Sequence, residues 1–154
     1  MASPSNSTPS LKLLDWPIEQ LPGLSRENQQ NLHHCGIATT QTLIRKTRTD
    51  RQQQQIANQL KIAVRDVQKW GIMAQLACLP SVGSRYCGLL LHAGVSSIAQ
   101  LATLPAARVH QQVLRIQVAT MQRRDLCPPV DEVARWIQEA RMLVNAQQKA
   151  RGER

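Results

Sequence analysis

Two short turns in the sequence combine residues that suit the binding of an anion. The first, LPGLSR, spans residues 21–26, and the second, LPSVGSR, spans residues 79–85. Small residues in such a turn let the backbone approach a ligand closely, and free amides at the start of the following helix point toward an anion. The residues assigned to this chemistry are Gly23, Leu24, Ser25 and Arg26 in the first turn, and Val82, Gly83, Ser84 and Arg85 in the second.

The distribution of charge favours a polyanionic partner. The 154-residue chain has 19 Lys and Arg against 10 Asp and Glu, for a formal net charge of +9. No acidic residue occurs from Val67 to Arg124, so no neighbouring carboxylate in that stretch cancels the positive field. Nucleic acid is the first candidate partner, an anionic membrane surface the second and an acidic protein the third; added solubility is the alternative without a partner. The residues expected to widen the basic surface are Lys46, Arg48, Arg115, Arg123 and Arg124.

Other chemistries lack the residue patterns that they need. The four cysteines form no CxxC pair and follow no secretory signal, so we expect free thiols in a reducing cytosol. Cys127 with His110 or His92 matches no zinc spacing. No carboxylate pair, nucleophile elbow, P-loop or HExxH motif occurs, so we expect no catalytic residues, no metal and no cofactor. No apolar run approaches the roughly 20 residues of a membrane span, and a cytoplasmic protein is expected.

A repeated residue pattern indicates two copies of one helical unit. An offset of 58 positions pairs the Leu-Pro of the two turns and pairs Gly36 with Gly94. Further along, an offset of 66 aligns two Val-x-x-Val-x-x-Trp stretches, at residues 64–70 and 130–136. Because repeated aromatic positions mark a shared core, both Trp residues of these stretches are expected to be buried.

The elements that position the turns are expected to be helices, because no segment shows sustained alternation of apolar and polar residues. Ser25 and Ser84 are expected to N-cap the helices that follow the turns, and Gly36 and Gly94 to end them. Short helices capped by Thr39 or Thr40 and by Ser96 or Ser97 come next. Longer helices are expected over Arg51–Leu60, from Val64 to about Leu79, over Ala106–Ile116, and from Asp131 past Leu143.

The stretch LPSVGSRYCGLLLHAGVSSIAQL resembles the helix-hairpin-helix motif, and LPGLSRENQQNLHHCGIATTQTLI is a weaker copy. From about Ile18 to Leu143 the chain is similar to a domain-of-unknown-function family of tandem helix-hairpin-helix proteins common in cyanobacteria. The resemblance implies a turn that grips nucleic-acid phosphates without reading bases. It also implies two motifs packed as one pseudo-symmetric unit. Each turn here keeps one glycine where the motif usually has two. The second turn is the better match, since Glu27 follows Arg26 directly in the first.

These observations predict an all-α fold of two tandem helix-hairpin-helix units, related by duplication and packed as one small globular module. The expected division is a flexible tail at 1–14, a first unit at 15–76, a second at 77–145 and a basic tail at 146–154. The function expected is that of a non-enzymatic module that contacts nucleic-acid phosphates, DNA or RNA, with Arg85 at the primary site. The alternative is a protein-interaction adapter with an acidic partner and no direct contact with nucleic acid.

Overall fold

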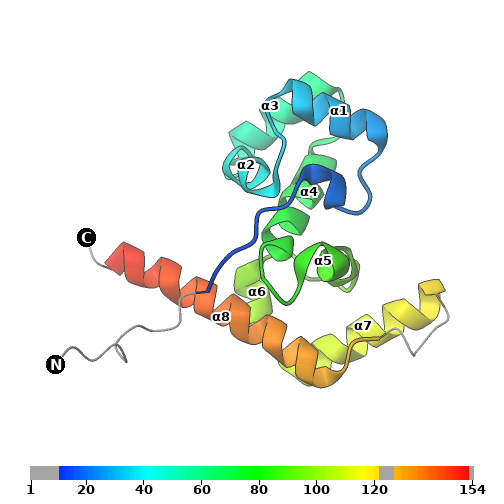
Figure 1. Cartoon of the computed structure of the whole chain (residues 1–154), viewed down its shortest axis with the longest axis vertical. Coiled ribbons are helices and arrows are strands. Elements are labelled where there is room, and N and C mark those ends of the chain that lie inside the picture. The colour runs from blue at the N-terminus through cyan, green and yellow to red at the C-terminus, as the bar shows by residue number, and fades with distance from the viewer. Residues whose placement is uncertain (1–10, 122–126, 153–154) are drawn as a thin grey trace.

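The fold is all-α throughout residues 11–121 and 127–152, the part of the chain that the computed structural model describes (Figure 1). Within these ranges no β-strand occurs, and Pro17 and Thr39 form an isolated antiparallel bridge. A 3-10 turn at Ile18–Gln20 precedes the α-helices. The α-helices are α1 (Arg26–His34), α2 (Thr40–Arg45), α3 (Asp50–Leu60), α4 (Val64–Ala77), α5 (Gly83–His92), α6 (Ile98–Thr103), α7 (Ala106–Met121) and α8 (Val130–Gly152).

Five helix ends follow from local capping residues that the sequence predicted. The side chains of Ser25, Thr39 and Ser97 each accept a hydrogen bond from a backbone amide in the first turn of α1, α2 and α6. After α1 and α5, Gly36 has a φ of 79° and Gly94 a φ of 100°. This left-handed region favours glycine, which has no Cβ to strain the backbone. Glycine therefore ends both helices.

The N-cap predicted at Ser84 is wrong, because α5 begins one residue earlier, at Gly83. The amides of Val82 and Gly83 both donate to the Leu79 carbonyl, at 3.0 and 2.9 Å, so the turn winds directly into the helix. Val82 is the N-cap residue and contributes no side-chain hydrogen bond. Ser84 consequently lies inside the first turn of α5 and cannot cap it.

Two helix C-terminal ends differ from the predicted ones. Helix α4 ends at Ala77, shortly before Pro80, whereas the prediction continued it to about Leu79. Helix α7 continues past Ile116 to Met121, because no Gly or Pro interrupts it there. Helix α8 runs past Leu143, as predicted, and ends at Gly152, so residues 146–152 of the predicted basic tail are helical.

Helix α4 links the two ends of the molecule. It contacts α2, α3 and α5, whereas α8 contacts α6 and α7. Figure 1 shows α1–α3 gathered at one end and α8 lying across the other. Trp70 on α4 is 6% exposed and Trp136 on α8 is fully buried, which confirms the predicted core positions. Aliphatic side chains fill the rest of the core, as expected of a chain without Phe; the fully buried leucines are Leu32, Leu43, Leu76, Leu79, Leu90 and Leu101.

Residues 11–17, which we call the N-terminal segment, run along the junction between α4 and α5. The Leu14 amide donates to the Cys78 carbonyl at 2.8 Å. The Trp16 indole Nε1 donates to the Ala77 carbonyl at 2.7 Å. Leu14, which the sequence had placed in a tail, is therefore bonded to the residue that caps the C-terminus of α4. This placement decides which of the two turns faces solvent.

Candidate functional site

The first turn, residues 21–26, is open to solvent on its backbone side. Gly23 has a φ of 83° and is exposed, and a Cβ built on it would have no heavy atom within 4 Å. Leu24 is 8% exposed and holds the turn to the core. The amides of Gly23, Leu24, Ser25 and Arg26 donate no hydrogen bond to the described part of the chain. Those of Gly23, Ser25 and Arg26 belong to exposed residues, so three N–H donors are available. The Arg26 side chain is exposed beside them.

The second turn, residues 79–85, is covered from two sides. The Ser81 amide donates to Glu139 Oε1 at 2.9 Å, and the Ser81 hydroxyl donates to Glu139 Oε2 at 2.5 Å. The Trp136 indole Nε1 donates to the Ser81 carbonyl at 3.0 Å. On the other side, a Cβ at Gly83 would lie 3.3 Å from Cζ2 of Trp16. A carboxylate of the protein thus already occupies an anion position at this turn.

Two of the four residues assigned to the second turn face solvent. Val82 is 1% exposed and Gly83 is buried, so their amides lie inside the fold. Ser84 is half-buried, and Arg85 is exposed with its guanidinium 5.1 Å from the ring centre of Tyr86. The Arg85 guanidinium is therefore at the surface over the ring of Tyr86, whereas the Val82 and Gly83 amides are buried.

The described cations are not neutralised by carboxylates. Among residues 11–119 and 127–150, whose side chains the structure describes, no Lys or Arg lies within 4.0 Å of an Asp or Glu oxygen, and the ion pair found joins His33 to Glu19 at 2.7 Å. Lys46 Nζ donates to the Cys35 carbonyl at 3.1 Å. Arg48 is exposed just before α3, and Arg115 is exposed on α7. Arg123 and Arg124, also predicted for the basic surface, lie outside the described residues.

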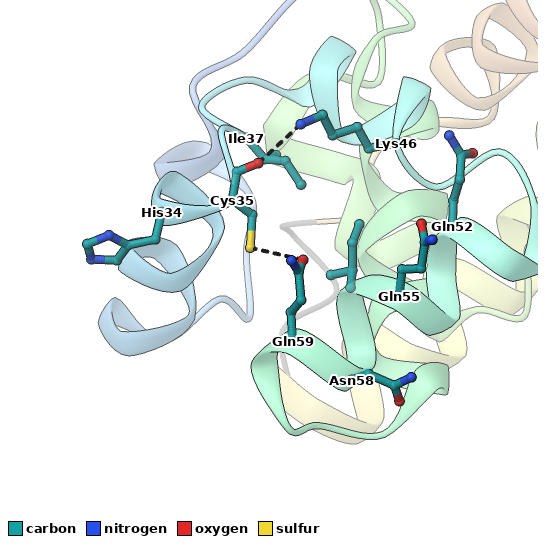
Figure 2. Close-up of a pocket in the computed structure, with 9 residues that line it drawn as sticks. His34, Cys35, Ile37, Lys46, Gln52, Gln55, Asn58 and Gln59 are labelled. Atoms are coloured by element: carbon teal, nitrogen blue, oxygen red, sulfur yellow. Dashed lines mark hydrogen bonds between the residues drawn. The ribbon is translucent and has the colours of Figure 1, made fainter.

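A feature that the sequence analysis missed is a cleft between the end of α1 and the exposed side of α3 (Figure 2). Its volume is about 730 Å³. The spacing of Gln52, Gln55 and Gln59 on α3 places their side chains on one face, a signal that the glutamine-rich composition of this stretch obscured. We call it the α1–α3 cleft; its lining residues are His34, Cys35, Ile37, Lys46, Gln52, Gln55, Ile56, Asn58 and Gln59.

Burial disfavours the thiolate form of three of the four cysteines. Burial raises the pKa of Cys78 and that of Cys87 to about 11, which disfavours the reactive thiolate. Cys127 Sγ lies 3.9 Å from His110 Nε2, and burial raises the pKa of this thiol also. Among the described residues no three His, Cys, Asp or Glu side chains gather around a common point that could hold a metal ion. None of the described helices is both long and apolar enough to cross a membrane.

Comparison with known proteins places most of the chain in one family model. The model, described as "Domain of unknown function (DUF4332)", matches residues 22–143 and so includes both turns and the α1–α3 cleft. No curated protein and no solved structure is similar enough to be matched.

Proposed function

We propose that this chain, which belongs to the DUF4332 family, is a non-enzymatic helical module that binds nucleic acid through its phosphate backbone. The observation that carries the proposal is the set of exposed cations that have no carboxylate partner in the described part of the chain. Such cations gain by neutralising phosphates and releasing the counterions of nucleic acid. Phosphates carry no base identity, so binding is expected to be independent of sequence.

The first turn is the better candidate for the primary phosphate contact, although the sequence favoured the second. Its backbone amides are free and its glycine is exposed, whereas the corresponding Ser81 amide is bonded to Glu139. Free amides at the N-terminus of α1 suit a phosphate oxygen. Arg26 supplies a positive charge, and Glu27 beside it opposes the phosphate.

We also propose that the two halves are related as tandem helix-hairpin-helix units. Equivalent residues make equivalent bonds, since Ile37 N donates to Leu32 O and Val95 N to Leu90 O, at 2.9 and 3.0 Å. The helices that follow, α2 and α6, both have six residues and a hydroxyl N-cap. The difference between the turns comes from position in the chain, because the N-terminal segment and α8 cover the second turn.

Binding to an acidic protein is the alternative. A continuous apolar face on the surface would favour the function of a protein-interaction adapter. In the described part of the chain, the large hydrophobic residues that are exposed are Leu13, Val118 and Val130, which lie on three different segments. Scattered exposed apolar residues are normal and indicate no docking face. Charge is therefore the feature that a partner would recognise.

The test is fluorescence anisotropy of labelled duplex DNA, single-stranded DNA and structured RNA with the full chain over a range of salt concentrations. We expect the logarithm of the binding constant to fall linearly with the logarithm of salt concentration. Arg26→Glu should weaken binding to every sequence alike, and Glu27→Gln should strengthen it. Arg135→Glu on α8 changes the net charge equally and is the matched control, because Arg135 is exposed and distant in sequence.

Two results would contradict the proposal. If no salt-sensitive binding is found at micromolar concentration, the chain does not bind phosphate backbones, and the adapter takes its place. If Arg26→Glu and Arg135→Glu have equal effects while Arg85→Glu is larger, the primary contact lies at the second turn. Circular dichroism of each variant confirms that the helices are intact.

A further inference from the structure

The α1–α3 cleft has the volume of a small-molecule site. Its volume of about 730 Å³ lies within the roughly 300–1,000 Å³ typical of ligand pockets. Ile37 and Ile56 lie behind its polar lining and are 0% and 5% exposed, so they belong to the core that supports the cleft. Figure 2 shows Cys35 and Gln59 facing each other across the cleft, with Lys46 reaching over one end.

The carboxamides around the cleft have free N–H donors. Gln52 Oε1 accepts two backbone amides at the start of α3, at 3.1 and 3.2 Å. Asn58 Oδ1 accepts from Gln54 Nε2 at 2.9 Å, and Gln59 Oε1 accepts from the Cys35 thiol at 3.6 Å. Each of the three oxygens accepts at least one hydrogen bond, whereas the three NH₂ groups make none within the described part of the chain.

Lys46 gives the cleft a positive charge. Its Nζ donates one hydrogen bond, to the Cys35 carbonyl at 3.1 Å, which leaves two N–H groups for a ligand. No carboxylate is among the lining residues, so nothing in the cleft neutralises Lys46. Gln55 is exposed beside it and makes no side-chain hydrogen bond to the described residues. The ligand that fits is rich in acceptors and anionic.

We infer that the α1–α3 cleft binds a nucleotide. Its phosphate pairs with Lys46, and acceptor atoms on the edge of the base accept hydrogen bonds from the NH₂ groups of Gln55 and Gln59. Base edges carry several acceptors, such as N7 and O6 of guanine, that suit amide donors. A phosphate alone would leave most of the volume unfilled. If the nucleotide is an unpaired residue of a nucleic-acid strand, the inference rests on the proposed function. If it is a free nucleotide, the inference does not depend on the proposed function.

The experiment measures binding of four probes to the full chain by isothermal titration calorimetry. The probes are a single-stranded oligonucleotide, an abasic strand of the same length, the four mononucleotides and polyglutamate. The variants are Lys46→Met and Gln55→Ala, with Lys69→Met on α4 and Gln138→Ala on α8 as matched controls, since both control side chains are exposed outside the cleft. Gln55→Ala removes no hydrogen bond within the described chain, so its fold is expected to be intact.

The expected result is that the oligonucleotide binds at least threefold more tightly than the abasic strand. Gln55→Ala should weaken oligonucleotide binding about two- to tenfold, the value of one hydrogen bond, and leave the abasic strand unchanged. Mononucleotides that bind with the same sensitivity to Lys46→Met and Gln55→Ala would support the site and identify the source as free nucleotide.

Other results overturn the inference. If both strands bind equally and Gln55→Ala has no effect, the proposal of phosphate binding is supported and the inference of a nucleotide site is refuted. If neither strand binds and mononucleotides do not bind, both proposals fail. Binding of polyglutamate alone, weakened by Lys46→Met and not by Lys69→Met, would assign the cleft to an acidic peptide.

Discussion

The contact between Glu139 and Ser81 makes a quantitative prediction about stability. Glu139 on α8 is 9% exposed and accepts two hydrogen bonds, from the Ser81 amide at 2.9 Å and from its hydroxyl at 2.5 Å. A hydrogen bond to a charged group contributes about 1.5–3 kcal/mol, and desolvation of the carboxylate offsets part of the sum of two. Glu139→Ala should therefore lower the free energy of unfolding by about 2–3 kcal/mol.

Two further variants divide this value between the two bonds. Ser81→Ala removes the hydroxyl bond alone and should cost about 1 kcal/mol. Glu139→Gln keeps an oxygen for the amide and loses the charge, so it should also cost about 1 kcal/mol. The double variant Glu139→Ala/Ser81→Ala should be no less stable than Glu139→Ala, because its hydroxyl bond is already gone. The resulting coupling energy is about 1 kcal/mol.

The assay is urea denaturation followed by circular dichroism at neutral pH, supported by thermal melts. For a chain of this size, a loss of about 2–3 kcal/mol corresponds to a fall in Tm of about 4–12 °C. A change below about 0.5 kcal/mol for Glu139→Ala would show that the carboxylate does not stabilise the turn. Strict additivity of the two single variants would refute the bond between them.

Three other predictions concern the core, a helix end and the thiols. Trp70→Ala and Trp136→Ala should each cost about 3–5 kcal/mol in urea denaturation, as buried large-to-small changes; a cost under about 1 kcal/mol would contradict their burial. Gly94→Ala should cost about 1–3 kcal/mol through backbone strain alone, because φ is 100° and space is open around a Cβ. Cys78 and Cys87, with pKa raised to about 11, keep their protons longer in the folded chain than in the unfolded one. The free energy of unfolding should then fall as pH rises from about 9 to 11. The Cys78→Ala/Cys87→Ala variant should reduce this pH dependence, and a urea midpoint that depends on pH as strongly in the variant as in the original chain would contradict the prediction.

Local signals were sufficient for most of the fold. Helix caps act on backbone groups within a few residues of themselves, so the sequence alone predicts their effect. The caps predicted in this way are the hydroxyls of Ser25, Thr39 and Ser97 and the glycines Gly36 and Gly94. Ser84 failed as a predicted cap because two amides of the turn bond to Leu79 and begin the helix early. The two turns have similar sequences but different backbone hydrogen bonds.

The candidate site depended on contacts between distant parts of the chain. Trp16 reaches Gly83 and Ala77, and Glu139 reaches Ser81 across 58 residues, so no local pattern indicates that the second turn is covered. The α1–α3 cleft was missed for a related reason. Its charge comes from Lys46 at the end of α2, while its amides come from α3, and the two meet only once the helices pack.

The double cover of the second turn also has a consequence during protein synthesis. Ser81 is made well before its partner Glu139, which follows 58 residues later. At a translation rate of about 5–20 residues per second, the nascent chain spends about 3–12 seconds with the turn made and its carboxylate absent. Trp16 is made before Ser81, so one of the two covers of the turn is present in the chain from the start. The other cover is acquired only when Glu139 has been made and α8 packs against the turn.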